Sequence, residues 1–261
     1  MASPSFIAHQ IVGALYQTAD IFLPKVCASC AGFGTSMDWS RGLCARCDFL
    51  VRQSLLNTHQ PVLRYALPPV MAASRYEYEC ARCILAFKNG GRTDLTEYFA
   101  TALWRALAAL CALHDVQGEI MLVPAPSSFK SLHRRGYEPA DELTRALLTK
   151  LKSAEISPNL EFSRHKLLRQ RSSGSSSQGQ KLLGVAARGQ RSKHSIALAH
   201  SATRWFGIEP SLVGRTCVLV DDVVTTGATL AVMTKVLQGQ GMRVLGAVTV
   251  AAVPSRTSVA H

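Results

Sequence analysis

The residues best suited to chemistry lie between positions 221 and 229. Two adjacent acids, Asp221 and Asp222, close an apolar run, and a loop of small residues follows them in the same segment. That loop consists of Thr225, Thr226, Gly227, Ala228 and Thr229. Its backbone N–H groups, and those of a helix expected to begin near Gly227, favour an anion because the first N–H groups of a helix lack partners and its dipole is positive there. The spacing predicts a phosphate site.

The acid pair restricts the kind of phosphate compound. Asp221 and Asp222 would repel a second phosphate, but their carboxylates can accept hydrogen bonds from the vicinal hydroxyls of a ribose whose 5′-phosphate occupies the loop. The segment resembles the phosphoribosyl diphosphate motif of type I phosphoribosyltransferases, in which an apolar run and two acids precede a Thr-Thr-Gly-x-Thr loop. The alternative is an ordinary turn between a strand and a helix, although adjacent acids are costly there unless they are used.

The elements around this segment alternate between strand and helix. Residues 218–220 are apolar without polar alternation, as in a parallel strand buried on both faces. The other expected elements are helices at 94–113, 139–151 and 228–237 and strands at 120–123 and 244–250. Asp94 is expected to cap the first helix, with Glu97 answering it. In a chain of 261 residues with 48% apolar content, this order predicts an α/β fold with a parallel sheet flanked by helices.

Four cysteines in the N-terminal part have the spacing of a metal site. Cys27 and Cys30 form one CxxC pair, Cys44 and Cys47 form another, and thirteen residues separate the pairs. Each pair can present two thiolates to one tetrahedral zinc, as in zinc ribbons and knuckles. The alternatives are two disulfides, which a reducing compartment disfavours, or buried free thiols. The pattern predicts a small structural zinc module.

The other four cysteines are expected to pack rather than to bind metal. Cys80 and Cys83 form a third CxxC pair, but no fourth pair follows and their neighbours are apolar and aromatic. Cys111 and Cys217 lie in apolar stripes and are expected to be buried thiols.

With both motifs present, nearly the whole chain resembles the ComF family, competence-type proteins with a four-cysteine metal module and a phosphoribosyltransferase-like domain. Shorter matching stretches are Leu23-Pro24, Pro124-Ala125-Pro126, Arg134-Arg135-Gly136-Tyr137, and Arg164 with Gln180, Leu183 and Arg188. The chain departs at Glu138-Pro139, where the family typically has Asn-Gln, so a backbone donor is lost and a charge is added. The resemblance implies a type I phosphoribosyltransferase-like sheet that binds phosphoribosyl diphosphate with magnesium.

We expect a boundary between two domains near residue 60, where a proline-containing connector lies. Residues 1–60 would form an N-terminal helix and a zinc-ribbon-like module, and residues 61–261 would form the phosphoribosyltransferase-like domain. Apolar residues in 6–23 have near-helical spacing, but polar residues interrupt them. This pattern favours an amphipathic helix over a signal peptide or membrane span, and we therefore expect a cytoplasmic location.

The net charge of +12 is unevenly distributed. No acid occurs between Glu161 and Glu209, where nine basic residues lie. Within this stretch, 172–180 is rich in Ser, Gly and Gln and is expected to be a mobile loop. Three interpretations of 164–193 stay open: a lid that closes over the diphosphate, a stripe that follows the phosphates of nucleic acid, or a solvated basic face.

Three further cations are candidates for contact with the diphosphate. Lys88 belongs to a polar glycine turn, 88–92, which is expected just before a helix N-terminus, although a plain turn fits equally well. Arg134 and Arg135 follow the strand expected at 120–123, and a guanidinium group can bind phosphate bidentately; a solvated face is the alternative. The chain has no Ser-His-Asp or HExxH spacing, so the sequence does not support a hydrolase.

Two functions stay open. In the first, Asp221 and Asp222 are catalytic, Mg²⁺ neutralises the diphosphate, and a nitrogen nucleophile attacks the anomeric carbon as diphosphate leaves. In the second, the same pocket is a non-catalytic binder of a nucleotide or sugar diphosphate, while the zinc module and basic face contact single-stranded DNA or a DNA-uptake protein. The sequence identifies no acceptor.

Overall fold

The computed structural model describes residues 25–34, 39–40, 42–170, 196–199 and 210–254. The helix expected at 6–23 and the loop expected at 172–180 lie outside the described residues, as do Leu23-Pro24, Gln180, Leu183 and Arg188. Within the described ranges, no helix combines the length and apolar character that crossing a membrane would require.

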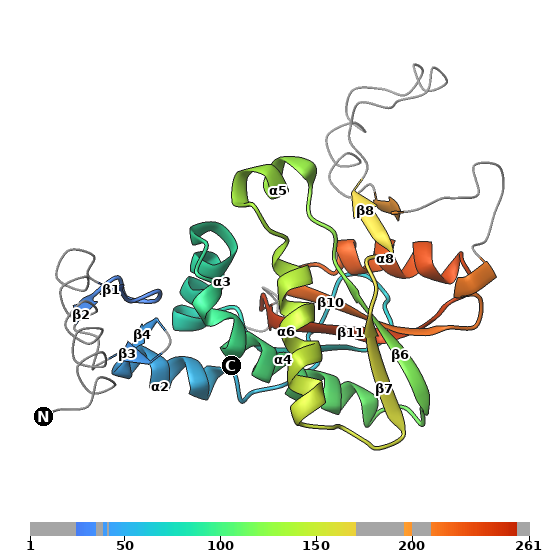
Figure 1. Ribbon diagram of the computed structural model, residues 1–261, viewed down its shortest axis with the longest axis horizontal. Helices are drawn as coiled ribbons and strands as arrows, with labels where there is room; N and C mark the ends of the chain where they lie inside the picture. The colour runs from blue at the N-terminus through green and yellow to red at the C-terminus, as the bar shows by residue number, and fades with distance from the viewer. Residues whose placement is uncertain (1–24, 35–38, 41, 171–195, 200–209, 255–261) are drawn as a thin grey trace, which may run out of the picture.

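A five-stranded parallel sheet forms the centre of the molecule (Figure 1). Its strands are β5 (Val70–Arg75), β6 (Gly118–Pro124), β7 (Leu160–Arg164), β10 (Thr216–Val224) and β11 (Arg243–Ala252). They lie in the order β5-β11-β10-β6-β7, and every pairing is parallel. The expected parallel sheet is confirmed, and β10 is its central strand.

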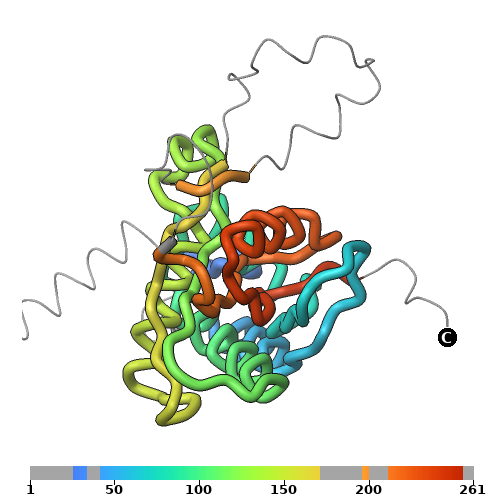
Figure 2. Tube along the Cα trace, turned by 90° about the vertical axis from the view of Figure 1, so that its right-hand side faces the viewer, coloured from blue at the N-terminus to red at the C-terminus, as the bar shows by residue number. Residues whose placement is uncertain are grey.

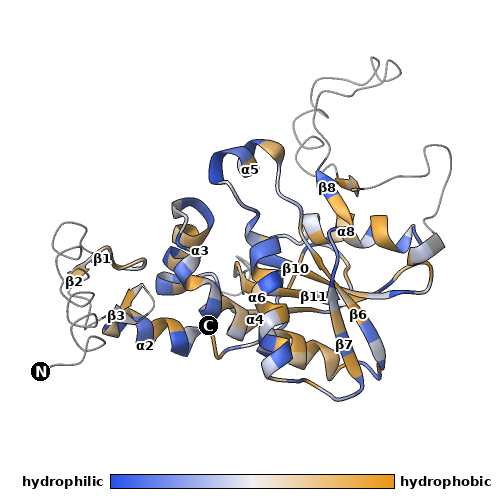
Figure 3. Ribbon diagram, viewed as in Figure 1, coloured by the Kyte–Doolittle hydropathy of each residue, from blue (hydrophilic) through white to orange (hydrophobic). Residues whose placement is uncertain are grey.

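The side chains of β10 alternate between two apolar cores, one on each face of the sheet. Val218 and Val220 pack in a core with α4 (Thr96–Cys111) and α6 (Pro139–Ser153). Cys217 and Leu219 pack in the other core with α8 (Ala228–Gln238). Both cores exclude water, so every residue from 217 to 220 must be apolar, and Figure 3 shows this apolar character along β10 and β11.

The expected helices and strands are present, although several begin or end at other residues than expected, and the predicted N-cap at Asp94 is wrong. The helix expected at 94–113 is a short 3-10 turn, Thr93–Leu95, followed by α4. Asp94 does not cap it: the N-cap of α4 is Leu95 without a side-chain hydrogen bond, and the carboxylate of Asp94 accepts from Arg92 instead. A further helix, α3 (Tyr78–Gly90), includes the first residues of the turn expected at 88–92.

The cysteine-containing segment forms a small module beside α3 (Figure 1). Its elements are β1 (Lys25–Val26), β2 (Phe33–Gly34), β3 (Trp39–Ser40), β4 (Leu43–Cys44) and α2 (Ala45–Ser54). β1 pairs antiparallel with β2, and β3 pairs antiparallel with β4. Its buried residues, among them Leu43, belong to the same apolar core as α3 and α4, so the module packs directly on the body of the protein.

The connector after α2 lies along the outer edge of the sheet. The backbone of His59 forms an antiparallel bridge with Ala72 of β5, which covers an otherwise unpaired edge. The connector then packs Leu63 and Leu67 beside α8, as Figure 2 shows for the cyan segment next to the orange helix.

The strand β6 is followed by one further helix, and two short strands and a 3-10 turn complete the described elements. α5 (Phe129–Arg135) follows β6 and projects from the body (Figure 1). β8 (Leu168–Gln170) pairs antiparallel with β9 (Ile196–Leu198), and a 3-10 turn, Pro210–Leu212, precedes β10. Because all five strands of the sheet are parallel, the loops that can bind a ligand meet at the edge formed by the carboxyl ends of the strands.

Candidate functional site

The two acids lie near the carboxyl end of β10, held by the backbone and by Lys88. The N–H of Asp222 donates to Asp221 Oδ1 at 2.8 Å, and the N–H of Val223 donates to Asp222 Oδ1 at 2.8 Å. Lys88 Nζ donates to Asp222 Oδ1 at 2.8 Å and lies 2.7 Å from Oδ2. The side chain of Asp222 is only 6% exposed, so the ion pair is shielded from water on the acid's side.

Lys88 reaches the acids from a different setting than the sequence indicated. It lies in the last turn of α3, not in a turn that leads into a helix N-terminus. Gly91 follows as the C-cap of this helix, with φ of 68°, which is the left-handed conformation that glycine tolerates. A cation near a helix C-terminus interacts favourably with the dipole, so the helix end supports Lys88 in this place.

The pKa of the Asp221 carboxyl is strongly raised in the folded protein. Burial and the neighbouring charge of Asp222 raise the pKa of Asp221 from 3.8 to about 8, although Lys88 acts in the opposite direction. The protonated form of this carboxyl is therefore favoured more than in an unperturbed Asp, and in that form it can donate as well as accept a hydrogen bond. A carboxyl whose pKa is shifted by burial and a charged neighbour, beside a cleft, is typical of functional sites.

A cleft of about 530 Å³ adjoins the acids. β10 contributes Asp221 and Asp222, α3 contributes Lys88, and the segment that leads into α5 contributes hydroxyl groups. The polar residues that line the cleft are Lys88, Ser127, Ser128, Ser131, Arg135, Gln170, Asp221, Asp222 and Thr229. The cleft thus combines two acids with hydroxyl groups and cations.

The threonine loop encloses a second, smaller space. A pocket of about 50 Å³ is lined by residues 223–230 together with Asp221. Gly227 is the N-cap of α8 with φ of 84°, and a Cβ there would lie 2.9 Å from Leu67 Cδ1. Glycine is therefore required both by the backbone and by the connector packed against it. Asp221, Val223 and Thr229 line the cleft as well as this pocket, so the two spaces adjoin.

The structure separates the two arginines of α5. Arg135 lines the cleft, and its Nε is buried without a hydrogen-bond partner among the described residues. Arg134 is exposed and does not line the cleft. Adjacent residues of a helix point about 100° apart, so one such pair rarely faces the same ligand.

The first cations of the acid-free stretch have carboxylate partners. Arg164 Nη1 donates to the buried Asp141, and Lys166 Nζ donates to Glu138. Glu138 therefore serves as an ion-pair partner, and Pro139 occupies the first turn of α6. Arg164 and Lys166 consequently belong to the fixed body of the protein rather than to a lid, and residues 171–193 lie outside the described part.

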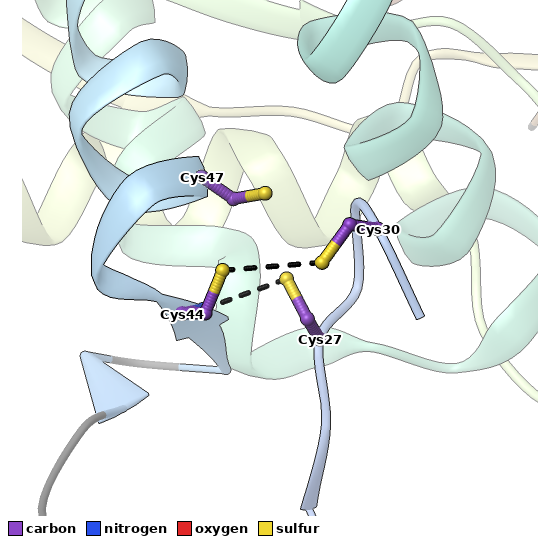
Figure 4. A group of neighbouring side chains, drawn as sticks. All are labelled: Cys27, Cys30, Cys44 and Cys47. Atoms are coloured by element: carbon purple, nitrogen blue, oxygen red, sulfur yellow. Dashed lines mark hydrogen bonds between the residues drawn. The ribbon is translucent and has the colours of Figure 1, made fainter. Parts of the chain in front are cut away.

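The four N-terminal cysteines converge (Figure 4). The sulfur atoms of Cys27, Cys30, Cys44 and Cys47 all lie within 4.8 Å of one another, and Cys30 Sγ is 3.9 Å from Cys44 Sγ. Four thiolates bound at about 2.3 Å to a tetrahedral zinc would lie about 3.8 Å apart, so the arrangement fits such an ion. The four cysteines could hold a metal ion.

The environment of the sulfurs favours charge at Cys27. Burial alone would raise its pKa, but the backbone N–H groups of Cys30, Cys44 and Ser29 outweigh burial and lower the pKa to about 7. Burial raises the pKa of Cys47 to about 12. A bound cation would deprotonate the remaining thiols, because a metal stabilises thiolate directly.

The other cysteines are buried and lie outside this group, as expected. Cys80 Sγ is 3.0 Å from Ser74 Oγ, and burial raises the pKa of the thiols of Cys83, Cys111 and Cys217 to between about 11 and 12. They are packed thiols.

Several lining residues were missed by the sequence analysis. Ser127, Ser128 and Ser131 line the cleft, and the signal for them was the serine-rich sequence directly after the strand that ends at Pro124. Ser128 also caps α5, since its Oγ accepts from the N–H of Ser131 at 3.2 Å. Gln170 carried no comparable signal, because only the folding of β8 brings it to the cleft.

Comparison with known proteins agrees with the fold. Residues 131–260 match the family model of the phosphoribosyl transferase domain. This stretch contains β10, the acid pair and the threonine loop, and together with the flanked five-stranded sheet it supports a type I phosphoribosyltransferase-like domain. No curated protein matches the chain.

Proposed function

We propose that the chain is a phosphoribosyltransferase-like protein of the ComF type, which binds phosphoribosyl diphosphate with Mg²⁺ at the acid pair. The proposal rests on one observation: Asp221 and Thr229 line both the cleft beside the acids and the small pocket of the threonine loop. A ribose 5-phosphate needs an anion site and a carboxylate pair within one sugar's length of each other. The threonine loop and the acid pair meet this requirement.

Each group in the site has a role in this proposal. The N–H groups of 225–229 hold the 5′-phosphate, and Asp221 and Asp222 accept from the ribose hydroxyls. Arg135 of α5, with a buried Nε that lacks a partner among the described residues, and Lys88 of α3 hold the diphosphate. Mg²⁺ bound with the diphosphate would neutralise part of its charge. In the transfer reaction, a nitrogen nucleophile attacks the anomeric carbon and diphosphate leaves.

Binding is tested by the thermal stability of the full chain with phosphoribosyl diphosphate and Mg²⁺. A ligand that binds only the folded state raises the unfolding free energy by about 2.7 kcal/mol at a hundredfold excess over Kd. The double variant Asp221→Asn, Asp222→Asn should lose this effect, whereas Asp115→Asn, at an exposed position away from the cleft, should keep it. Absence of a shift at millimolar ligand would refute the proposal.

We also propose that the four-cysteine module binds one structural zinc. The mutual distances of the sulfurs support this proposal, because they suit tetrahedral thiolate ligation. Elemental analysis of freshly purified, unchelated protein should give one zinc per chain. Protein with Cys30→Ser and Cys44→Ser should contain almost none, and a Cys111→Ser control should contain as much as the wild type.

A second candidate function is non-catalytic binding with a contact to single-stranded nucleic acid. The exposed face of α5 favours it: Phe129 is 80% exposed and stacks on His133, with ring centroids 6.3 Å apart, and the exposed cations Lys130 and Arg134 are the next residues in the helix after each ring. Aromatic rings beside cations suit unpaired bases. Release of diphosphate with a panel of nitrogen acceptors would favour transfer. Its absence, with salt-sensitive oligonucleotide binding lost in Phe129→Ala, would favour the binder.

A further inference from the structure

One guanidinium group holds both halves of the cysteine module. Arg92 Nη1 donates to the carbonyl oxygen of Val26 at 2.7 Å, and Nη2 donates to that of Gly42 at 2.9 Å. Val26 directly precedes Cys27, and Gly42 lies two residues before Cys44. Because Arg92 lies outside the module, these bonds join each pair of cysteines to the body of the protein.

Arg92 is itself held in position by Asp94. Nε of Arg92 donates to Asp94 Oδ1 at 3.0 Å, and Nη2 donates to Oδ2 at 2.7 Å. Gly42 approaches this pair so closely that a Cβ would overlap both Asp94 Oδ2 and Arg92 Nη2, and its φ is 80°. A charged, two-point contact of this kind is directional, because the planar guanidinium presents its donors in a fixed fork.

Arg92 belongs to the same short segment as Lys88, the lysine that forms an ion pair with Asp222. Lys88 lies in the last turn of α3, four positions before Arg92, with only Asn89, Gly90 and the C-cap Gly91 between them. Earlier turns of α3 place Cys80 and Cys83 in the core that also contains Cys27 and Cys47. The helix therefore contacts the module along its buried face and at its end, while Lys88 contacts Asp222.

We propose that Arg92 is a positioning residue that couples metal binding in the four-cysteine module to the placement of Lys88 in the cleft. When the module is closed around its metal, the carbonyls of Val26 and Gly42 fix Arg92 and so the end of α3. When the metal leaves, the two halves separate, Arg92 loses its acceptors, and Lys88 is no longer fixed against Asp222. Coupling between two sites is reciprocal, so a ligand that fixes Lys88 must also retain the metal.

The first test measures release of zinc from the zinc-loaded full chain to an excess of a chromogenic chelator. Arg92→Met should release zinc about tenfold faster than the wild type. Arg92→Lys, which can reach only one of the two carbonyls, should be intermediate, as should Asp94→Asn, which leaves the guanidinium in place but less firmly held. Arg82→Met, an exposed arginine on α3, is the matched control and should release zinc as the wild type does. Equal rates in all variants would overturn the proposal.

The second test detects the coupling without any ligand of the cleft. Chelation of the wild type should accelerate amide hydrogen exchange in the last two turns of α3 and its C-cap, residues 84–91, while β10 stays protected. Arg92→Met should show this faster exchange even with zinc bound. Unchanged exchange of residues 84–91 after chelation would overturn the coupling, as would protein that takes up no zinc.

The third test rests on the proposed function. Phosphoribosyl diphosphate with Mg²⁺ should slow zinc release from the wild type severalfold, and this effect should disappear in Arg92→Met. A residue with a merely structural role would change the release rate but not its dependence on the ligand. If the wild type does not bind the sugar diphosphate, the proposed function fails, and the first two tests still decide the role of Arg92. Binding without any effect on zinc release would overturn the coupling alone.

Discussion

Lys88 and Asp222 are 134 positions apart in the chain, yet Lys88 Nζ lies 2.8 Å from Asp222 Oδ1. The pair joins the last turn of α3 to the central strand β10. α3 lies before residues 131–260, the part that matches the phosphoribosyl transferase domain. The candidate site therefore includes a cation from outside that part, and α3 belongs structurally to the same unit as the acids.

Replacing Lys88 by Met should destabilise the protein. The substitution leaves the carboxylate of Asp222 nearly buried without its cation, and because Lys88 is itself about one-third exposed we expect a moderate loss of about 1–2 kcal/mol. Urea unfolding measures it. Lys235→Met, at an exposed position of α8, serves as the control. Adding Asp222→Asn to Lys88→Met should recover part of the loss, and a double variant less stable than Lys88→Met would contradict this account of the pair.

The pKa of Asp221 predicts a pH dependence of stability. Since this pKa is about 8 in the folded protein against 3.8 for an unperturbed Asp, the folded state keeps a proton that the unfolded state releases. The contribution of this group is therefore fully present below about pH 4 and is lost as the pH rises to about 8. Asp221→Asn, which cannot ionise, should lose less stability between pH 5.5 and 8.5, by about 1–3 kcal/mol.

Thermal unfolding at the two pH values checks this prediction. Asp115→Asn, at an exposed position, controls for the removal of a carboxylate as such and should follow the wild type. Parallel curves for the wild type and Asp221→Asn would show that Asp221 ionises normally in the folded protein.

The acid pair, the threonine loop and the cysteine pairs could be located from the sequence because each depends on local order. A strand that is buried on both faces has a continuous apolar sequence, as the neighbours Val218 and Leu219 show, and a phosphate loop needs small residues directly after it. Likewise, a CxxC pair places two sulfurs near one ion whatever surrounds it.

The tertiary part of the site could not be predicted in this way. That Lys88 reaches Asp222 depends on how α3 packs, and that Arg135 rather than Arg134 lines the cleft depends on the rotation of α5. The prediction that Asp94 caps the helix was wrong for a similar reason. The carboxylate of Asp94 accepts three charged hydrogen bonds from Arg92 and none from the backbone N–H groups at the start of the helix.

Two glycine substitutions separate backbone strain from crowding at the phosphate loop. Gly91 has φ of 68°, and a Cβ added there would meet no atom within 4 Å, so Gly91→Ala should cost only the strain of the left-handed conformation, about 1 kcal/mol. Gly227 has φ of 84°, and a Cβ would also press on Leu67, so Gly227→Ala should cost about 1 kcal/mol more. Urea unfolding measures both losses.

The same two variants should differ in ligand binding. Gly227→Ala moves the start of α8 and with it the N–H groups of the loop, so its affinity for phosphoribosyl diphosphate should fall at least tenfold. Gly91→Ala should bind within a few-fold of the wild type. Equal affinities in the two variants would mean that the loop does not hold the 5′-phosphate.

Removal of the metal should affect the thiols in two classes. If Cys27, Cys30, Cys44 and Cys47 bind one metal ion, as proposed, they lose it on chelation and should then react together with a thiol reagent. Cys217 lies within β10 and is fully buried, and Cys111 lies at the end of α4, so both should stay protected until denaturant unfolds the sheet.

Thiol counting before and after chelation checks this prediction, with the Cys111→Ser variant identifying the contribution of that residue. Cys80 and Cys83 give the more informative result, because they lie on α3 and belong to the same apolar core as the buried residues of the cysteine module. If they become reactive together with the four ligands, loss of the metal extends into the helix that carries Lys88. If all eight cysteines of the chain react at one rate, the sheet itself depends on the metal, and the module is not a separate unit of stability.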